Sequence, residues 1–452
     1  MARVLLAVWP YTGHVYPNIA LAEALRARGH EVAFYTGAMA RPVVESEGFA
    51  CLPFQHVALG IERIVGQPDT DRKDGWNTAL LYDRLTEHYT AAFDQGAFTR
   101  ARRMQAMYHE WILGTVPQQV RDLEGILADW KPDVIVCDPF MWGPILVLHE
   151  TRSIPVAVFS YFAGCLLPGP NVPPFALGLP RPRHRWTRAL VKLLELGKNL
   201  FFLDLRREAN RVRQEHGLKP LTTSIMEFAG RMPLYLVASV PEFDYERCDL
   251  PPSVHYVGPC LWDKPQREPA PAWLDELSQD RAVVYVTEGT AHVRAPILLR
   301  AASHGLAHRP MQVIMTTGWH RDPEKLDLGP GAANIRVQHW VPHSDLFPKA
   351  SVVVTHGGSG TVLSALQAGL PLVIVPMQWD HLENAQRVVE AGAGLQLRPG
   401  QCTPERLRAA VDRVLNEPAF RQNARRLSAA LQRHTGAERA ATLLENLRQT
   451  AA

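Results

Sequence analysis

Short apolar runs alternate with helical patterns along most of the chain, beginning at the N-terminus. Arg3 to Val8 is apolar, and residues 17–28 follow with apolar side chains at helical spacing, before Gly29 and a second strand-like run over 31–36. Strand, helix and strand in this order predict a βαβ unit, which joins parallel strands of one sheet. The segment therefore predicts an α/β fold with its ligand-binding loops at the carboxyl ends of the strands.

The same alternation recurs and is interrupted once. It returns before Asp138, at 154–160, and again from Ala282 onwards, whereas residues 241–277 hold seven prolines and little periodicity, as an interdomain linker does. We expect two doubly wound, Rossmann-like domains facing each other across a cleft. The first spans 1–240, and the linker and second domain span 241–452, with the last helix packing back on the first domain.

Two irregular, aromatic- or proline-rich tracts, 57–108 and 166–182, interrupt the first domain. Long excursions from a regular scaffold are often functional, so both are expected to form walls of a binding cleft; a structural cover over the sheet is the alternative. Residues 190–205 form an amphipathic pattern broken by charges, which predicts a helix packed on the body or, alternatively, a hydrophobic lip.

The composition narrows the class of protein. Lys and Arg number 48 against 45 Asp and Glu, a formal charge of +3, which gives no bulk electrostatic reason to expect a nucleic-acid partner. The six cysteines form no C-x-x-C pair and indicate a reduced, cytoplasmic protein without a zinc site. The N-terminal apolar run is too short for a signal peptide, and no window resembles a membrane span.

A glycine-rich turn follows the strand-like run SVVVT and contains Gly357, Gly358 and Gly360, with His356 before it. The helix that follows has first-turn amides without internal partners, and its dipole is positive there, so an anion such as a phosphate fits. A plain βα corner is the alternative. The third glycine of a dinucleotide fingerprint is missing, because Leu363 occupies its position.

Three further side chains extend this region. Asp380 follows the next strand and can accept hydrogen bonds from sugar hydroxyls or cap the next helix. Trp340 ends a strand and can stack on a nucleobase or belong to the core. Glu288, within the turn TEGT, is acidic beside an expected phosphate and has no evident role.

The first half of the chain offers an acid–base pair. His14 lies in the first βα loop, with Gly13 before it and Pro17 in position to begin the helix. A histidine at a cleft is a candidate general base, although an ordinary loop histidine is the alternative. Asp138 ends a strand at the same edge of the sheet. If the two meet, the carboxylate fixes the imidazole tautomer and stabilises the imidazolium.

These motifs together resemble a known family. The run WVPHSDLFPKASVVVTHGGSGTVLSALQAGLPLVIVPMQWDHLENAQ resembles the donor-binding signature of family 1 glycosyltransferases of GT-B fold, and GHVYP and VCDPF resemble their acceptor-side motifs. The resemblance covers most of the chain and is strongest over 283–397. It implies a cytoplasmic, inverting hexosyltransferase that uses UDP- or dTDP-sugars with no metal or cofactor. Its partners would be a nucleotide-sugar donor and a lipophilic natural-product acceptor.

The resemblance also implies roles for individual residues. His14 matches the general base that deprotonates an acceptor hydroxyl, and Asp138 matches its paired aspartate. Trp340 matches the base-stacking residue, and Asp380 with His381 matches the pair on the donor sugar. The complete set of donor-binding positions is Thr290, Trp340, Val341, His356, Gly358, Ser359, Gly360, Thr361, Asp380 and His381.

Two departures from the family pattern concern the donor. His381 stands where most members have glutamine, which leaves the hexose open. Ser364 stands where uridine-using members often have glutamate, and this favours a dTDP-sugar. A GT-B epimerase, a lipid-linked sugar transferase and a catalytically silent binding partner remain alternatives.

Overall fold

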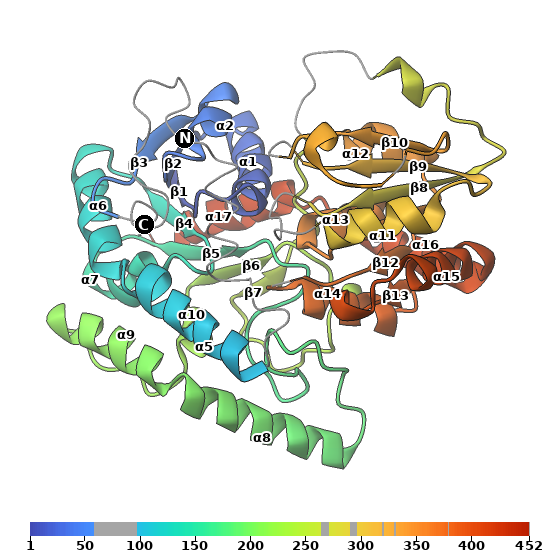
Figure 1. The fold of residues 1–452 in the computed structure, drawn as a ribbon. Helices are drawn as coiled ribbons and strands as arrows, with labels where there is room; N and C mark the ends of the chain where they lie inside the picture. The colour runs from blue at the N-terminus through green and yellow to red at the C-terminus, as the bar shows by residue number, and fades with distance from the viewer. Residues whose placement is uncertain are drawn as a thin grey trace.

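The computed structural model of the chain describes residues 1–57, 97–263, 271–289, 296–318, 321–329, 331–377 and 379–451. These residues form two α/β domains side by side, each built on a parallel sheet with helices against it (Figure 1). The predicted pair of doubly wound domains is therefore confirmed.

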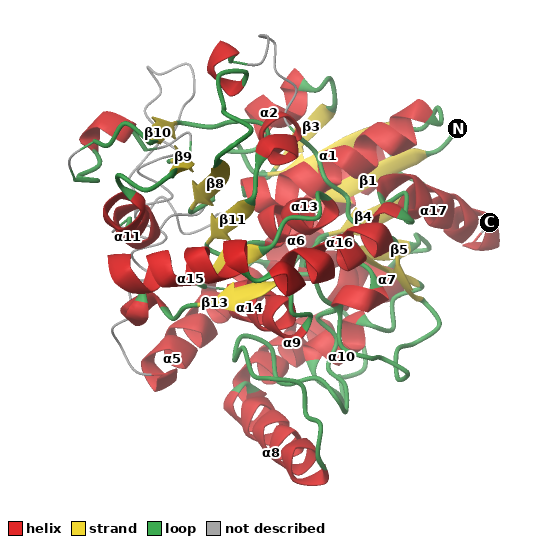
Figure 2. Cartoon of the chain, turned by 90° about the vertical axis from the view of Figure 1, so that its right-hand side faces the viewer, coloured by secondary structure: helices red, strands yellow, loops and turns green. Residues whose placement is uncertain are grey.

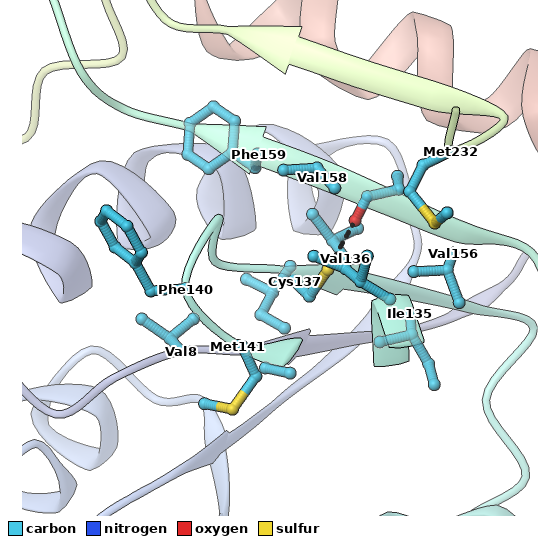
Figure 3. Packing of buried hydrophobic residues seen from close by; sticks show 14 of the residues in the cluster. Val8, Ile135, Val136, Cys137, Phe140, Met141, Val156, Val158, Phe159 and Met232 are labelled. Atoms are coloured by element: carbon cyan, nitrogen blue, oxygen red, sulfur yellow. Dashed lines mark hydrogen bonds between the residues drawn. The ribbon is translucent and has the colours of Figure 1, made fainter. Parts of the chain in front are cut away.

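The first domain is built on a seven-stranded sheet of order β3-β2-β1-β4-β5-β6-β7. Its inner strands are buried on both faces, so their sequences are continuous apolar runs and not alternating ones. Figure 3 shows side chains from β4, β5 and neighbouring segments packed together in this core. The strands are β1 (Arg3–Ala7), β2 (Glu31–Thr36), β3 (Ala50–Pro53), β4 (Val134–Cys137), β5 (Val156–Ser160), β6 (Leu234–Val237) and β7 (Val254–Tyr256).

Helices cover this sheet and extend beyond it (Figures 1 and 2). They are α1 (Thr12–Ala27), α2 (Arg41–Ser46), α5 (Ala97–Met107), α6 (Val116–Asp129), α7 (His149–Thr151), α8 (Arg185–Phe201), α9 (Leu203–Glu215) and α10 (Ile225–Ala229).

The second domain has a six-stranded sheet of order β10-β9-β8-β11-β12-β13, with one apolar cluster on each face. Its strands are β8 (Ala282–Thr287), β9 (Met311–Thr316), β10 (Ile335–Gln338), β11 (Val352–Thr355), β12 (Leu372–Ile374) and β13 (Gly394–Gln396). Its helices are α11 (Ile297–Leu306), α12 (His343–Leu346), α13 (Ser359–Gln367), α14 (His381–Glu390), α15 (Pro404–Asn416) and α16 (Pro418–Gln432), and the chain ends with α17 (Ala437–Ala451).

Both sheets reverse their strand order at an equivalent place. The reversal lies between β1 and β4 in the first sheet and between β8 and β11 in the second. Ligands of doubly wound folds bind beyond the carboxyl ends of the strands at this point. The segments directly after β1, β4, β8 and β11 carry His14, Asp138, Glu288 and His356.

The chain crosses between the domains differently from the predicted boundary at 240. β7 pairs with β6 in register Tyr235 with Val254, so part of the segment expected to be a linker forms the edge of the first sheet. The sequence did not predict β7, because this strand has only three residues and lies in a proline-rich segment. At the other end, α17 returns to the first domain and packs on α1 and β6, where Figure 1 shows the red helix beside the blue one.

The first helix also begins earlier than predicted. The amides of His14 and Val15 both donate to the carbonyl of Tyr11, so α1 starts at Thr12 and Pro17 lies inside it. Proline is a common first helical residue, which explains the misplaced start. His14 consequently sits in the first helical turn, not in a loop.

The amphipathic pattern over 190–205 is divided between α8 and α9, which meet at Phe202. The expected packing on the body is wrong for most of α8, because Val191 is its only buried residue. Within the described part of the chain, no helix combines the length and apolarity needed to cross a bilayer.

A buried ion pair joins the two domains. The guanidinium of Arg387, on α14, donates to Asp244 from Nε at 3.0 Å and Nη2 at 2.9 Å, and both side chains are 5% exposed or less. Burial acts to lower the pKa of Arg387, but the carboxylates of Asp244 and Glu383 raise it above its usual value. A Cβ on residue 164 would lie 2.4 Å from the guanidinium carbon of Arg387. Glycine at position 164 therefore leaves the space that the arginine side chain occupies.

Glu383 holds the proline-rich tract 166–182 from the same helix. Its carboxylate accepts the amide of Gly178 at 2.9 Å and lies 3.6 Å from Arg387 Nη1. Ala176 and Gly178 both have positive φ, which curls this segment around the carboxylate. The tract is thus fixed against the second domain.

Substituting Arg387 with Met is expected to reduce the free energy of unfolding by about 3–5 kcal/mol, because it leaves Asp244 buried without its partner. Chemical denaturation monitored by circular dichroism measures the loss. Arg413→Met is the control: its pair with Glu417 is 56% and 48% exposed, and such pairs contribute at most about 1 kcal/mol. Equal losses in the two variants would contradict the assignment.

Candidate active site

The predicted contact between His14 and Asp138 is present in the first domain. His14 Nδ1 lies 2.6 Å from Asp138 Oδ2, and the amide of Phe140 donates to Asp138 Oδ1 at 2.9 Å. Asp138 is fully buried, whereas the imidazole is 22% exposed. β1 and β4 are neighbours, so the two residues that follow them meet at the reversal of strand order.

Tyr161 is a third member that the sequence prediction missed. Its hydroxyl lies 2.5 Å from His14 Nδ1 and 3.3 Å from Asp138 Oδ2. Burial, and then the carboxylates of Asp138 and Asp380, raise the pKa of this phenol well above its usual value, so the hydroxyl stays protonated. Its position directly after β5, at the same edge of the sheet, is the signal that could have identified it.

The glycine-rich turn of the second domain opens onto a helix N-terminus. Gly358 occupies the N-cap of α13, and no side chain caps that end. In the described residues no acceptor takes the first-turn amides of Ser359, Gly360 and Thr361, and Gly360 is exposed. These amides and the positive end of the helix dipole form the anion-binding arrangement that the sequence predicts.

Two neutral histidines flank this turn. The rings of His356 and His381 are 4.5 Å apart at nearly perpendicular planes. Burial lowers the pKa of each imidazole to about 3, with His381 adding to the effect on His356. A Cβ on Gly289 would lie 2.2 Å from the His356 ring, so the loop after β8 needs glycine at this position.

Asp380 faces the turn and does not cap a helix. Its carboxylate accepts from Ser359 Oγ at 2.6 Å and from Asn384 Nδ2 at 2.7 Å, although it occupies the N-cap position of α14. The capping alternative is therefore wrong for the side chain. Burial raises the pKa of Asp380, while the two hydrogen bonds oppose that shift. The carboxylate is held at the edge of the glycine turn.

Glu288, to which the sequence alone assigned no role, is a structural residue. Its carboxylate accepts the amide of Leu298 at 2.9 Å, at the start of α11, and receives Arg321 Nη1 at 2.5 Å. Both side chains are buried. The carboxylate therefore stabilises α11 and points away from the anion-binding turn.

The remaining predicted donor-site residues are distributed around this region. Trp340 is half-buried after β10, and Val341 is 1% exposed in the core. Ser364 lies on α13 and is half-buried. Thr290 lies outside the described residues.

The two halves of the site meet at the loop after β5. The amide of Ala163 donates to Ser359 Oγ at 2.8 Å, and Tyr161, two residues earlier, contacts His14. The same Ser359 hydroxyl donates to Asp380. His14 in one domain and the N-terminus of α13 in the other are thus joined through three residues of a single loop.

Comparisons with known proteins agree with this geometry. Residues 311–445 match the family described as erythromycin biosynthesis protein CIII-like, C-terminal domain. The 4'-demethylrebeccamycin synthase of Lentzea aerocolonigenes is 35% identical over 429 residues, which cover 94% of each chain.

Solved structures share the fold. The glycotransferase of kitacinnamycin aligns over 99% of both chains with a TM-score of 0.71 and 21% identity. The glycosyltransferase SsfS6 of Streptomyces sp. SF2575, solved with thymidine diphosphate, covers 99% of this chain and 100% of its own at a TM-score of 0.62 and 21% identity.

The buried histidines predict how stability depends on pH. His356 and His381 have pKa values of about 3 in the folded protein, against about 6.5 in an unfolded chain. Between these values the unfolded chain binds more protons, so stability falls on acidification by up to about 1.4 kcal/mol per pH unit for each histidine.

Replacing His381 with Gln should remove the contribution of this histidine to the fall in unfolding free energy between pH 7 and pH 5. Chemical denaturation at several pH values measures the dependence of the unfolding free energy on pH. His216→Gln, at an exposed position, is the control and should leave the slope unchanged. An unchanged slope in His381→Gln would show that this imidazole is not buried in the neutral form.

Proposed function

The chain belongs to the natural-product glycosyltransferases of GT-B fold, and we propose that it transfers a hexose from a nucleoside-diphosphate sugar to a hydroxyl of a lipophilic small molecule, with inversion at the anomeric carbon. The observation that carries the proposal is the meeting, at the loop after β5, of the His14–Asp138 pair with the open N-terminus of α13.

His14 is the general base in this proposal. Its Nδ1 is occupied by Asp138 and Tyr161, whereas its Nε2 makes no hydrogen bond with a described residue. Nε2 removes the proton of the acceptor hydroxyl as the oxygen attacks the anomeric carbon. Asp138 keeps the tautomer that leaves Nε2 unprotonated and stabilises the imidazolium that forms.

The N-terminus of α13 stabilises the leaving group. As the bond from the anomeric carbon to the diphosphate oxygen breaks, the electron pair and negative charge move to the diphosphate. The amides of Ser359, Gly360 and Thr361 donate to it, and the helix dipole opposes its charge. His356 is placed to add a neutral hydrogen bond. No metal ion or cofactor takes part, and EDTA is expected to leave the rate unchanged.

Asp380 and His381 bind hydroxyls of the donor sugar, and Trp340 stacks on the base. Where this chain has Ser364, many family members that use uridine nucleotides have a glutamate, which binds both ribose hydroxyls. Because the deoxyribose of dTDP lacks one of these hydroxyls, dTDP is the proposed nucleotide. The acceptor is proposed to be a lipophilic natural product. Support comes from the similarity to the 4'-demethylrebeccamycin synthase of Lentzea aerocolonigenes, which aligns over 94% of this chain.

Replacing His14 with Ala is expected to lower kcat at least about a hundredfold, because a positioned base contributes roughly two to four orders of magnitude. Mass spectrometry of the glycosylated product measures the rate. Nucleotide binding should be unchanged, since His14 lies in the other domain. His216→Ala is the control for loss of an exposed imidazole. Transfer at the normal rate by His14→Ala would exclude the mechanism.

A thermal-shift series with UDP, dTDP and GDP tests the donor site. Binding of dTDP is expected to stabilise the fold, by about 2.7 kcal/mol at a concentration a hundred times Kd, and more than UDP does. Asp380→Asn should bind dTDP as the wild type does but lose affinity for the dTDP-sugar. Absence of stabilisation by every nucleotide would refute the donor-site assignment.

A further inference from the structure

Helix α8 lies at the lower edge of the molecule in both orientations (Figures 1 and 2). It exposes a row of large apolar side chains. Of the nine large apolar side chains exposed in the described residues, five belong to this helix. They are Trp186 at 68%, Leu190 at 47%, Leu193 at 64%, Leu196 at 56% and Leu200 at 63% exposure.

These five residues follow one another at intervals of four, three, three and four. That spacing places them on one face along the whole helix, opposite the buried Val191. Isolated exposed leucines are ordinary on protein surfaces, but a continuous apolar face marks an interaction surface. The face extends from Trp186 to Leu200, over nearly the whole of this 17-residue helix.

Basic side chains run along one side of this apolar face. Arg185, Arg188 and Lys192 are exposed, and Arg183 precedes the helix. In the described part of the chain no carboxylate pairs with any of the four. The single acidic residue of α8, Glu195, is paired with Lys198 at 2.7 Å. The surface therefore combines exposed apolar groups with uncompensated positive charge.

We propose that α8 is an interfacial helix that binds an anionic lipid bilayer, its apolar face at the boundary between headgroups and acyl chains and its basic side on the lipid phosphates. A helix that is short, apolar on one face and basic beside it has this behaviour. Trp186 at its start is a residue that bilayer interfaces favour. A second copy of the chain fits less well, because two basic rows would then lie close together.

The position of α8 connects this binding to catalysis. The helix follows directly on the tract 166–182, which Glu383 fixes against the second domain. The bilayer would thus lie beside the acceptor domain, where a lipophilic acceptor partitions. This last step rests on the proposed function, whereas membrane binding itself does not.

Co-sedimentation with vesicles tests the proposal on the full chain. The wild type is expected to sediment with phosphatidylcholine vesicles containing phosphatidylglycerol and to remain soluble with phosphatidylcholine alone. Arg185→Glu/Arg188→Glu should weaken partitioning by at least about twentyfold, because each basic residue near an anionic surface contributes about fivefold. Leu193→Glu/Leu196→Glu should abolish it.

Two control substitutions lie elsewhere on the surface and should leave vesicle binding unchanged. Arg426→Glu reverses an exposed charge on α16, and Val389→Glu places a charge at an exposed apolar position on α14. Circular dichroism and the thermal unfolding midpoint without ligand confirm that each variant is folded. Vesicle binding is read independently of sugar transfer, so failure of the proposed function would leave this result intact.

Three outcomes would overturn the proposal. The first is a wild type that stays in the supernatant with anionic vesicles. The second is a Leu193→Glu/Leu196→Glu variant that binds them normally, which would assign binding to another surface. The third is a wild-type dimer, measured by light scattering, that the leucine variant dissociates while neither protein binds vesicles; α8 would then be a contact between copies.

Discussion

The buried pair of Arg387 and Asp244 fixes how the two domains meet, and the site depends on that geometry. Burying an arginine is costly unless carboxylates and hydrogen bonds compensate, and here Asp244, Glu383 and the ring of Tyr245 surround it. Such a group tolerates few alternative arrangements, because any shift leaves a charge buried without a partner. The pair therefore selects one orientation, in which the loop after β5 reaches α13.

That loop contacts both halves of the proposed site. Tyr161 contacts His14, and the amide of Ala163 donates to the hydroxyl of Ser359, which in turn donates to Asp380. Tyr161 is buried in the apolar cluster of the first domain and Ala163 in that of the second, so this loop is packed against both domains. In the proposed reaction, the two sides of the site are therefore connected by three residues of one loop.

Much of this arrangement follows from local sequence. The alternation of apolar runs and helices, with residues of known chemistry directly after strands, was enough to predict two α/β domains and to place His14 and Asp138 at the same edge of the first sheet. The contact of Tyr161 with His14 and the structural role of Glu288 could not be predicted in this way, for different reasons. An aromatic residue after a strand has the same pattern as a core residue, and the partner of Glu288, Arg321, is distant in sequence.

The packing of α8 was predicted wrongly. The periodicity of its apolar residues shows that the helix is amphipathic, but it does not show which face packs against the rest of the protein. Its pattern has one stripe around Val191 that packs and another, from Trp186 to Leu200, that does not. Only the tertiary structure distinguishes them.

The proposed donor site relies on dipoles and neutral hydrogen bonds more than on fixed charge. His356 and His381 are held neutral by burial, and the first-turn amides of α13 present about half a positive charge. Amides already aligned by the helix need no reorganisation when the diphosphate takes up charge, so they stabilise the transition state efficiently. In the proposed reaction, a partial charge also binds the released nucleotide less tightly than a buried arginine would, so the same helix terminus would serve both bond cleavage and product release.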